Sequence, residues 1–245
     1  DIALLALSHH TSTSDGDAMR ASHCTLDIFL QMMNFLCMSG SAGMALEKIS
    51  GLFLSSKKSD NNLQLSLPDI VTCLTICDKF IFWICCVYIL LYKKLPDAVV
   101  QKFECRKECS AIEWPSVSLR SDEKQQAASL LELAVDSLAL YMDHESLENE
   151  TTLRAAHLFA LNHVRCVSVL EGLECSRNLL GKYIKLYPSC LELVLMSARA
   201  EYDLGGSNFN GFEEALRNWP DEVPGIHCIW NQYVGCVFQS GKFDF

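Results

Sequence analysis

The sequence predicts an all-α protein in which antiparallel helix pairs stack into an α-solenoid. Three observations favour this fold class. Long segments with a hydrophobic period of 3.6 residues dominate, whereas alternating Val, Ile and Thr runs are few. Hydrophobic residues make up 50% of the 245 residues and only 12 residues are glycine, so a substantial core is expected. Finally, a unit of two helices recurs every 33 to 36 residues near the C-terminus.

Residues 1–66 are expected to form a helical hairpin followed by a polar linker. Between residues 20 and 38 the apolar side chains recur with helical spacing, which predicts a helix. A break at Ser39, Gly40 and Ser41 precedes a second helix that carries Ala45 and Ile49 on its apolar face. Two helices joined by a short glycine-containing turn form an antiparallel hairpin. Residues 55–66 are polar and read as a linker.

Residues 67–121 contain the most apolar part of the chain, residues 70–94. A membrane-spanning helix needs about 18 or more apolar residues. Asp78 and Lys79 interrupt this segment, which favours a helix buried on most sides over a membrane span. The two charged residues are expected to reach solvent or partners at one edge. Pro96 is suited to the first turn of a short helix, and residues 110–121, with Trp114, form a connector.

Residues 122–245 are expected to form helical repeats. Helices are predicted over residues 122–142, 151–170 and 174–187, and the next one ends at Gly205. Ser189 and Glu192 have the spacing of a capping box at the start of that helix. The last two helices are expected to bury Phe209, Phe212, Ala215, Leu216 and Trp219, and then Ile226, Ile229, Trp230, Tyr233 and Val237.

The proline and glycine residues that end the helices of this region recur at regular spacing. Pro188 and Pro224 are 36 residues apart, as are Gly205 and Gly241, while Gly172 precedes Gly205 by 33. A two-helix unit of this length is typical of an α-solenoid. The residues that mark the repeat are Pro188, Gly205, Phe212, Ala215, Leu216, Trp219, Pro220, Pro224, Trp230, Tyr233 and Gly241. The chain lacks an initial Met and stops at Phe245 just after a new unit begins, which is the pattern expected of a segment truncated from a longer protein.

Charge and cysteine content narrow the class of protein. The net charge of −10 does not favour phosphate-rich partners, and the basic pairs are short and scattered. The 13 cysteines include Cys24, Cys37, Cys166, Cys190 and Cys236 within helical patterns. A long helical chain differs from a small secreted disulfide scaffold, so these thiols are expected to be reduced and mostly buried.

No group of residues in the sequence predicts a catalytic or metal-binding site. Cys73 and Cys77, and likewise Cys105 and Cys109, have a spacing that zinc sites use, but no His lies between Asp78 and Asp143, and core packing is expected instead. Cys105 and Cys109 flank two basic residues, which leaves a redox role as an alternative. His157 and His163 have no metalloprotease spacing, and no phosphate-binding loop or nucleophile motif is found. We therefore expect a non-enzyme without catalytic residues, metal or cofactor.

The last two helices resemble half-a-TPR (HAT) repeats. In that family the first helix of a repeat carries Trp-x2-Tyr, and the second carries Phe-Glu-x-Ala-Leu followed by Pro. Phe212, Glu213, Ala215, Leu216 and Pro220 match the second helix, and Trp230 and Tyr233 match the first. The Glu that usually follows the Tyr by four residues is Val237 in this chain. The resemblance covers about residues 151–245 and implies a HAT/TPR-like solenoid.

A second resemblance covers residues 70–245. The stretches LTICDKFIFWICCVYILLYKKLPDAVVQKFEC, IEWPSV, YPSCLELVLMSA and NWPDEVPGIHCIWNQY are similar to the C-terminal helical-repeat region of zinc-finger C3H1 domain-containing proteins, especially plant members. The resemblance implies a nuclear scaffold that links the exosome-associated RNA helicase to polyadenylated transcripts destined for decay. The family's Cys-x8-Cys-x5-Cys-x3-His finger does not occur in this chain, so RNA contact is expected to be indirect.

These observations predict a non-catalytic protein–protein interaction scaffold in nuclear RNA surveillance and exosome-mediated decay. The implied partners are components of the exosome-associated RNA helicase complex, the implied location is the nucleus, and no membrane is involved. Self-association stays open. The alternative is a HAT/TPR-type scaffold of another RNA-processing complex, in splicing or 3′-end processing. Only the identity of the partner separates these two hypotheses.

Overall fold

The computed structural model describes residues 15–54, 67–105, 112–139, 142, 150–204 and 208–241. Over these ranges the chain is helical apart from turns and the extended segment 112–120, and contains no strand. The prediction of an all-α protein is confirmed. The chain divides into two compact units, Asp1–His163 and Val164–Phe245. The domain boundaries expected after residues 66 and 121 rest on composition and stay predictions.

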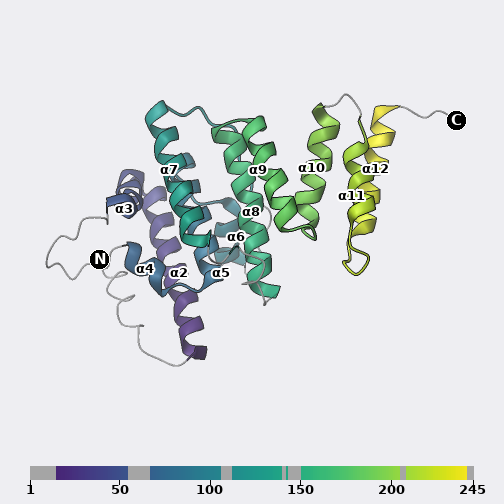
Figure 1. Cartoon of the computed structure of the whole chain (residues 1–245). Helices are drawn as coiled ribbons and strands as arrows, with labels where there is room; N and C mark the ends of the chain where they lie inside the picture. Colours follow the sequence, from purple (N-terminus) through teal and green to yellow (C-terminus); the bar gives the residue numbers. More distant parts are fainter. Residues whose placement is uncertain are drawn as a thin grey trace. The chain divides into compact units, whose positions relative to one another are not determined.

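Unit 1 is built around one buried helix, α5 (Ile76–Tyr92), which contacts α2, α3 and α7 (Figure 1). The other helices of this unit are α2 (Asp15–Met38), α3 (Ala42–Leu54), α4 (Leu67–Cys73), α6 (Asp97–Cys105), α7 (Ser121–Leu138) and the first part of α8 (Glu150–Leu170). The polar linker predicted over residues 55–66 lies outside the described residues.

The two helices predicted at the start of the chain are present as α2 and α3, and they contact each other. Leu26, Phe29 and Met33 are buried on the inner face of α2, and Ala45 and Ile49 are buried on α3. The turn between the two helices includes a glycine with φ of +76°, a conformation that side chains with a Cβ rarely adopt.

The apolar segment of the sequence is divided between α4 and α5, which is a difference from the expected helix. The break falls at Leu74 and Thr75, where Thr75 has extended backbone angles and its hydroxyl accepts the Asp78 N–H. Twelve of the 17 residues of α5 are buried, so the prediction of a helix buried on most sides is confirmed. The short helix after Pro96 is also present, as α6.

The connector before α7 is held against its neighbours by polar contacts. The Tyr92 hydroxyl donates to the Pro115 carbonyl at 2.7 Å, and the Trp114 indole N–H donates to Asn162 Oδ1 at 2.8 Å. These bonds join the end of α5 and the middle of α8 to one extended segment. Helical spacing over residues 122–142 predicts an inner face made of Ala127, Leu130, Leu131, Ala134, Leu138 and Tyr141. The first five are buried on α7, and Tyr141 lies outside the described residues.

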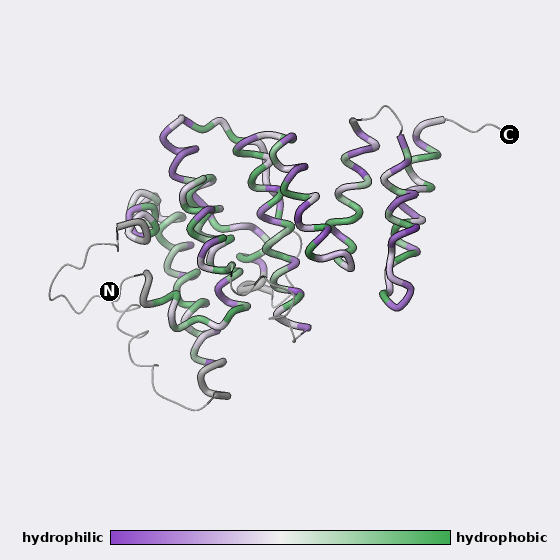
Figure 2. Tube along the Cα trace, viewed as in Figure 1, coloured by the Kyte–Doolittle hydropathy of each residue, from purple (hydrophilic) through white to green (hydrophobic). Residues whose placement is uncertain are grey.

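Unit 2 consists of the end of α8 and four helices that run back and forth beside one another (Figure 1). They are α9 (Leu173–Leu186), α10 (Leu191–Leu204), α11 (Asn210–Asn218) and α12 (Ile226–Ser240). Each helix contacts the next one along the chain, and α10 also contacts α12. The core between α10, α11 and α12 contains Val194, Ala198, Phe212, Trp219, Ile229 and Cys236. Hydrophobic and hydrophilic stretches alternate along these helices (Figure 2), as amphipathic helices require.

Candidate functional site

The residues that mark the predicted repeat meet where α11 packs on α12. Phe212 is fully buried, and its ring stacks on that of Tyr233 at a centroid distance of 5.7 Å. The Tyr233 hydroxyl is 3.2 Å from Glu213 Oε1. Trp219 is 6% exposed, and its indole N–H donates to the Val223 carbonyl at 2.9 Å. The aromatic side chains of α11 and the turn after it therefore hold α12 in place.

The other marker residues have smaller roles in packing. Pro220 is partly buried directly after α11, and Pro188 and Pro224 are exposed. Gly241 ends α12 with φ of +65°, as expected for a glycine at a helix C-terminus. Ala215 and Leu216 are partly buried and pack against the core. Gly205 lies outside the described residues.

One face of α12 is apolar and exposed, contrary to the expectation that Ile226 and Trp230 are buried. Exposed fractions along this face are 42% for Ile226, 50% for Trp230, 43% for Val234 and 63% for Phe238. The opposite face carries Ile229, which is fully buried. Which side chains of α12 are buried depends on the helices beside it. Within the described residues, α10 and α11 pack against α12 from one side.

The exposed face of α12 corresponds to a face that is covered on α10. At the 36-residue offset, Val194 and Ala198 correspond to Trp230 and Val234. Val194 is 8% exposed and Ala198 2%. The backbone of α11 lies so close to Ala198 that a Cβ on Gly211 would be 3.1 Å from the Ala198 Cα. The equivalent place beside α12 is open in the described structure. We refer to Ile226, Trp230, Val234 and Phe238 as the α12 face.

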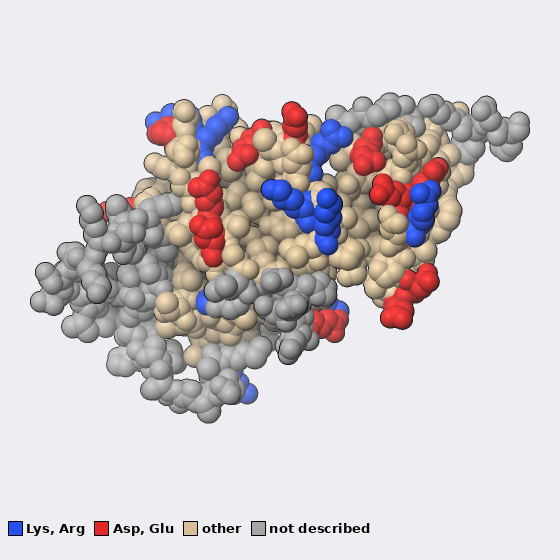
Figure 3. Space-filling view, in the orientation of Figure 1, with Lys and Arg blue, Asp and Glu red and all other residues tan. Residues whose placement is uncertain are grey.

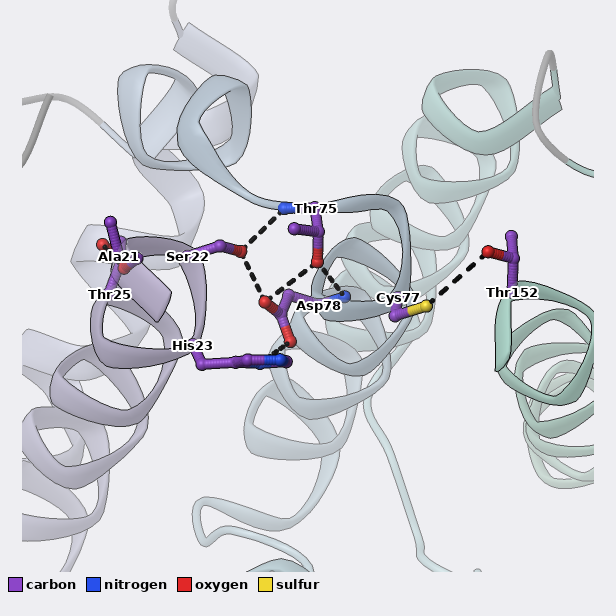
Figure 4. Close-up of polar contacts among 8 residues, drawn as sticks. All are labelled: Ala21, Ser22, His23, Thr25, Thr75, Cys77, Asp78 and Thr152. Atoms are coloured by element: carbon purple, nitrogen blue, oxygen red, sulfur yellow. Dashed lines mark hydrogen bonds and ion pairs between the residues drawn. The ribbon is translucent and has the colours of Figure 1, made fainter. Parts of the chain in front are cut away.

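A buried polar cluster in unit 1 joins α2 to the start of α5 (Figure 4). Asp78 is 1% exposed, and its carboxylate accepts hydrogen bonds from the hydroxyls of Ser22 and Thr75. His23 Nδ1 is 2.9 Å from the other oxygen of the same carboxylate. The Thr75 N–H in turn donates to Ser22 Oγ at 2.7 Å. As expected, Asp78 reaches partners at one edge of its helix. These partners are Ser22 and His23 of α2 and the N-cap residue Thr75.

The geometry of this cluster suits a role in holding α2 against the start of α5. Ser, His and Asp are the residue types of a hydrolytic triad, but in a triad the His accepts the proton of the Ser. Here Ser22 and His23 both contact Asp78. Sequence analysis missed the cluster, although Thr75 and Asp78 have the spacing of a helix N-terminal capping signal.

The cysteines divide into buried and accessible thiols. Cys85, Cys86, Cys166, Cys190 and Cys236 are buried, whereas Cys24 and Cys73 are exposed. Burial raises the pKa of the Cys190 thiol to about 11 and that of Cys166 to about 12, so both are protonated at neutral pH. The expected core packing is thus right for the buried set and wrong for Cys24 and Cys73, whose positions in a helical pattern did not show which face is covered.

Among the described residues, the accessible cysteines do not form a zinc-binding arrangement. Cys77 is partly buried, and its thiol donates a weak hydrogen bond to the Thr152 hydroxyl at 3.9 Å. The side chains of Cys105 and Cys109 lie outside the described residues. In the part of the chain that the structure describes, no three His, Cys, Asp or Glu side chains are placed to hold a metal ion.

The remaining surface shows mixed charge. Lys and Arg side chains lie between Asp and Glu side chains over the face drawn in Figure 3. Of the basic pairs in the sequence, Lys93 and Lys94 are described, and they lie 3.9 Å from Glu123 and 3.1 Å from Asp97. None of the helices in the described ranges combines the length and apolar character that a membrane crossing requires.

Comparisons with known proteins add no assignment. No protein-family model matches the chain, and no curated protein or solved structure matches it at a significant level. The α12 face and the helix packing beneath it are therefore the features on which a function has to be argued.

Proposed function

We propose that this chain is a non-catalytic protein–protein interaction scaffold of HAT/TPR-like helix pairs, acting in nuclear RNA surveillance and exosome-mediated decay. The exposed apolar side chains of the α12 face support the proposal that the chain binds other proteins. The pathway, the nuclear location and the helicase-complex partner come from the resemblance to zinc-finger C3H1 domain-containing proteins. RNA is reached through the protein partner, because the chain is acidic.

Equivalent residues of α10 and α12 support the repeat part of the proposal. Leu193 and Ile229 are 36 residues apart, and each is 0% exposed in the middle of its own helix. The turn before α12 uses Gly225 with φ of +134°, and a Cβ there would lie 3.2 Å from Leu191 and 3.3 Å from the Trp219 ring. A close turn between one helix pair and the next is what stacked two-helix repeats need.

The α12 face suits an amphipathic helix of a protein partner. Exposed apolar groups that lie in one row mark interaction surfaces, and Trp is frequent among the residues that dominate binding energy. Because α11 covers the equivalent face of α10, the occupant has the chemistry of α11. It presents Phe and Leu side chains at helical spacing toward α12 and keeps its acidic residues outside.

The test is affinity purification of the full 245-residue chain from nuclease-treated nuclear extract, followed by mass spectrometry. The wild-type chain is compared with a Trp230→Ser/Phe238→Ser variant. We expect the wild type to retain components of the exosome-associated helicase complex, and the variant to lose them. Nuclease treatment removes proteins that are held only through RNA.

A matched control changes two exposed apolar residues of unit 1, as Phe35→Ser/Met38→Ser. Phe35 and Met38 are 71% and 80% exposed, so the control removes similar apolar area elsewhere. Recovery of splicing or cleavage factors in place of the helicase complex would reject the pathway. Equal losses in both variants, or no loss in either, would reject the α12 face as the binding surface.

A further inference from the structure

A groove between α10 and α11 forms a pocket of about 270 Å³ within unit 2. Val194, Ser197, Ala198 and Glu201 line it from α10, at the i, i+3, i+4 and i+7 positions of one helical face. Its volume lies just below the range of about 300–1,000 Å³ that is usual for small-molecule sites, and it suits a single side chain.

The facing wall comes from α11 with the same spacing. Gly211, Glu214, Ala215 and Asn218 line this side, and Trp219 lines the groove beyond them. The two helix backbones approach closely at Gly211, as described above.

Polar side chains that have no protein partner surround this apolar floor. Within the described chain, no hydrogen bond or ion pair is formed by the side chains of Ser197, Glu201, Glu214 or Asn218. Glu201 is partly buried, and its Oε2 lies only 2.6 Å from the place where a Cβ on Gly211 would be. One carboxylate is thus held within the groove and another lies across from it.

The groove is lined by two carboxylates and by no basic side chain. Residues 191–241 contain seven Asp or Glu and two arginines, Arg199 and Arg217, whereas α9, whose Ile184 also lines the groove, carries Lys182 and Lys185. Arg199 is 3.3 Å from Gln232 on α12, and neither arginine lines the groove. The lining therefore offers two carboxylates to a cation, with no basic side chain among the lining residues.

We propose that the α10–α11 groove binds an arginine side chain presented by a segment of a partner protein. The methylene stem lies on Val194 and Ala198, and the guanidinium donates to the carboxylates of Glu201 and Glu214. A planar group with five donors can contact acceptors on both walls at once, which a point-like ammonium does less well. This inference rests on the proposed function, because it names a group that a protein partner of the scaffold presents.

The groove can be tested by NMR through its own tryptophan. Trp219 lines the groove, whereas Trp83 and Trp114 belong to unit 1 and Trp230 is on the α12 face. The ¹⁵N-labelled full chain is titrated with a nine-residue Ala/Gly peptide that carries one central arginine. The indole N–H signals are assigned with single Trp→Phe variants. We expect a saturable shift of the Trp219 signal and no shift of the Trp83 and Trp114 signals.

Two comparisons make the result decisive. Replacing the arginine by citrulline keeps the shape of the side chain and removes its positive charge. The variant Glu201→Gln/Glu214→Gln keeps the shape of the groove and removes its two negative charges. Each change should weaken binding about tenfold or more, since hydrogen bonds to charged groups are the stronger ones. The control Glu171→Gln/Glu174→Gln also removes two charges from unit 2, but these residues do not line the groove.

Equal binding of the arginine and citrulline peptides would overturn the proposal, as would equal weakening by the two double variants. Absence of a Trp219 shift at millimolar peptide would do so as well. Circular dichroism of each variant checks that the fold is retained. The result is separable from that of the affinity purification, because the α12-face variant leaves Glu201 and Glu214 in place.

Discussion

The apolar helices α5 and α12 differ in how much of their surface other helices cover. Both are apolar along much of their length, and both contain a tryptophan near aromatic neighbours. In α5, twelve residues are buried by packing against α2, α3 and α7. In α12, the buried residues are Ile229 and Cys236, and four large apolar side chains are exposed.

This difference shows that apolar composition and surface coverage are separate properties. The side chains of α5 contribute to folding because they leave water when unit 1 forms. The exposed side chains of α12 contribute little to folding and retain apolar area that a partner can cover. The same residue types thus stabilise the fold in one helix and leave apolar area exposed in the other.

The largest expected effect is on α5. Phe82 is fully buried, and its ring centroid lies 4.8 Å from that of Phe29 on α2. Phe82→Ala should lower the free energy of unfolding by about 3–5 kcal/mol, because it removes apolar contacts and leaves a cavity. Urea unfolding followed by circular dichroism measures the change. A loss below about 1 kcal/mol would show that α5 is less enclosed than described.

The next effect is a pH dependence beside α5. Phe80 of α5 contacts Phe159, which contacts His163 at a centroid distance of 5.8 Å. Burial lowers the pKa of His163 from 6.5 to about 4. Between these values the unfolded state takes up a proton that the folded state does not, so stability falls as the pH decreases from about 6.5 to about 4.

The expected loss is about 3 kcal/mol across this interval, from the shift in pKa. Carboxylates also titrate near pH 4, so the useful quantity is the difference between the wild type and His163→Gln. The free energy of unfolding is measured for both from pH 7 to pH 4. The two curves should diverge on acidification, and parallel curves would place His163 in a more solvated environment.

The smallest expected effect is on α12. Trp230→Ala should change the free energy of unfolding by about 0.5 kcal/mol or less, since exposed side chains contribute little to stability. Thermal unfolding followed by circular dichroism gives the value. A loss as large as that of Phe82→Ala would mean that Trp230 belongs to the core, which would contradict the proposal that the α12 face binds a partner.

The sequence predicted where most helices lie, but it predicted less well which face of each helix is buried. Helical spacing located α2, α7 and α8 well, because it depends on residues that are near in the chain. It did not show that Trp230 is exposed, since coverage depends on which helix packs beside α12. The same spacing placed Asp78 at an edge without revealing that Ser22, 56 residues away, completes its hydrogen bonds.

Helix ends were the least predictable detail. Ser189 and Glu192 were expected to cap α10, but the Cys190 carbonyl accepts the Val194 N–H at 3.1 Å. Cys190 therefore holds the N-cap position and Ser189 lies before it, so that prediction is wrong. The helix α11 begins at Asn210, with Phe209 in the N-cap position. Competing polar residues near a helix start differ little in free energy, and packing of the whole helix decides between them.

The tie between Ser22 and Asp78 has a consequence for biosynthesis. A ribosome releases α2 before α5, so the helix that covers part of the apolar surface already exists when that surface emerges. The Asp78 carboxylate finds two of its hydrogen-bond donors on α2 only once the two helices are docked in register. Once α5 has left the ribosomal exit tunnel, the emerged chain thus contains both halves of this contact, and α2 can dock on α5 before the rest of the protein is made.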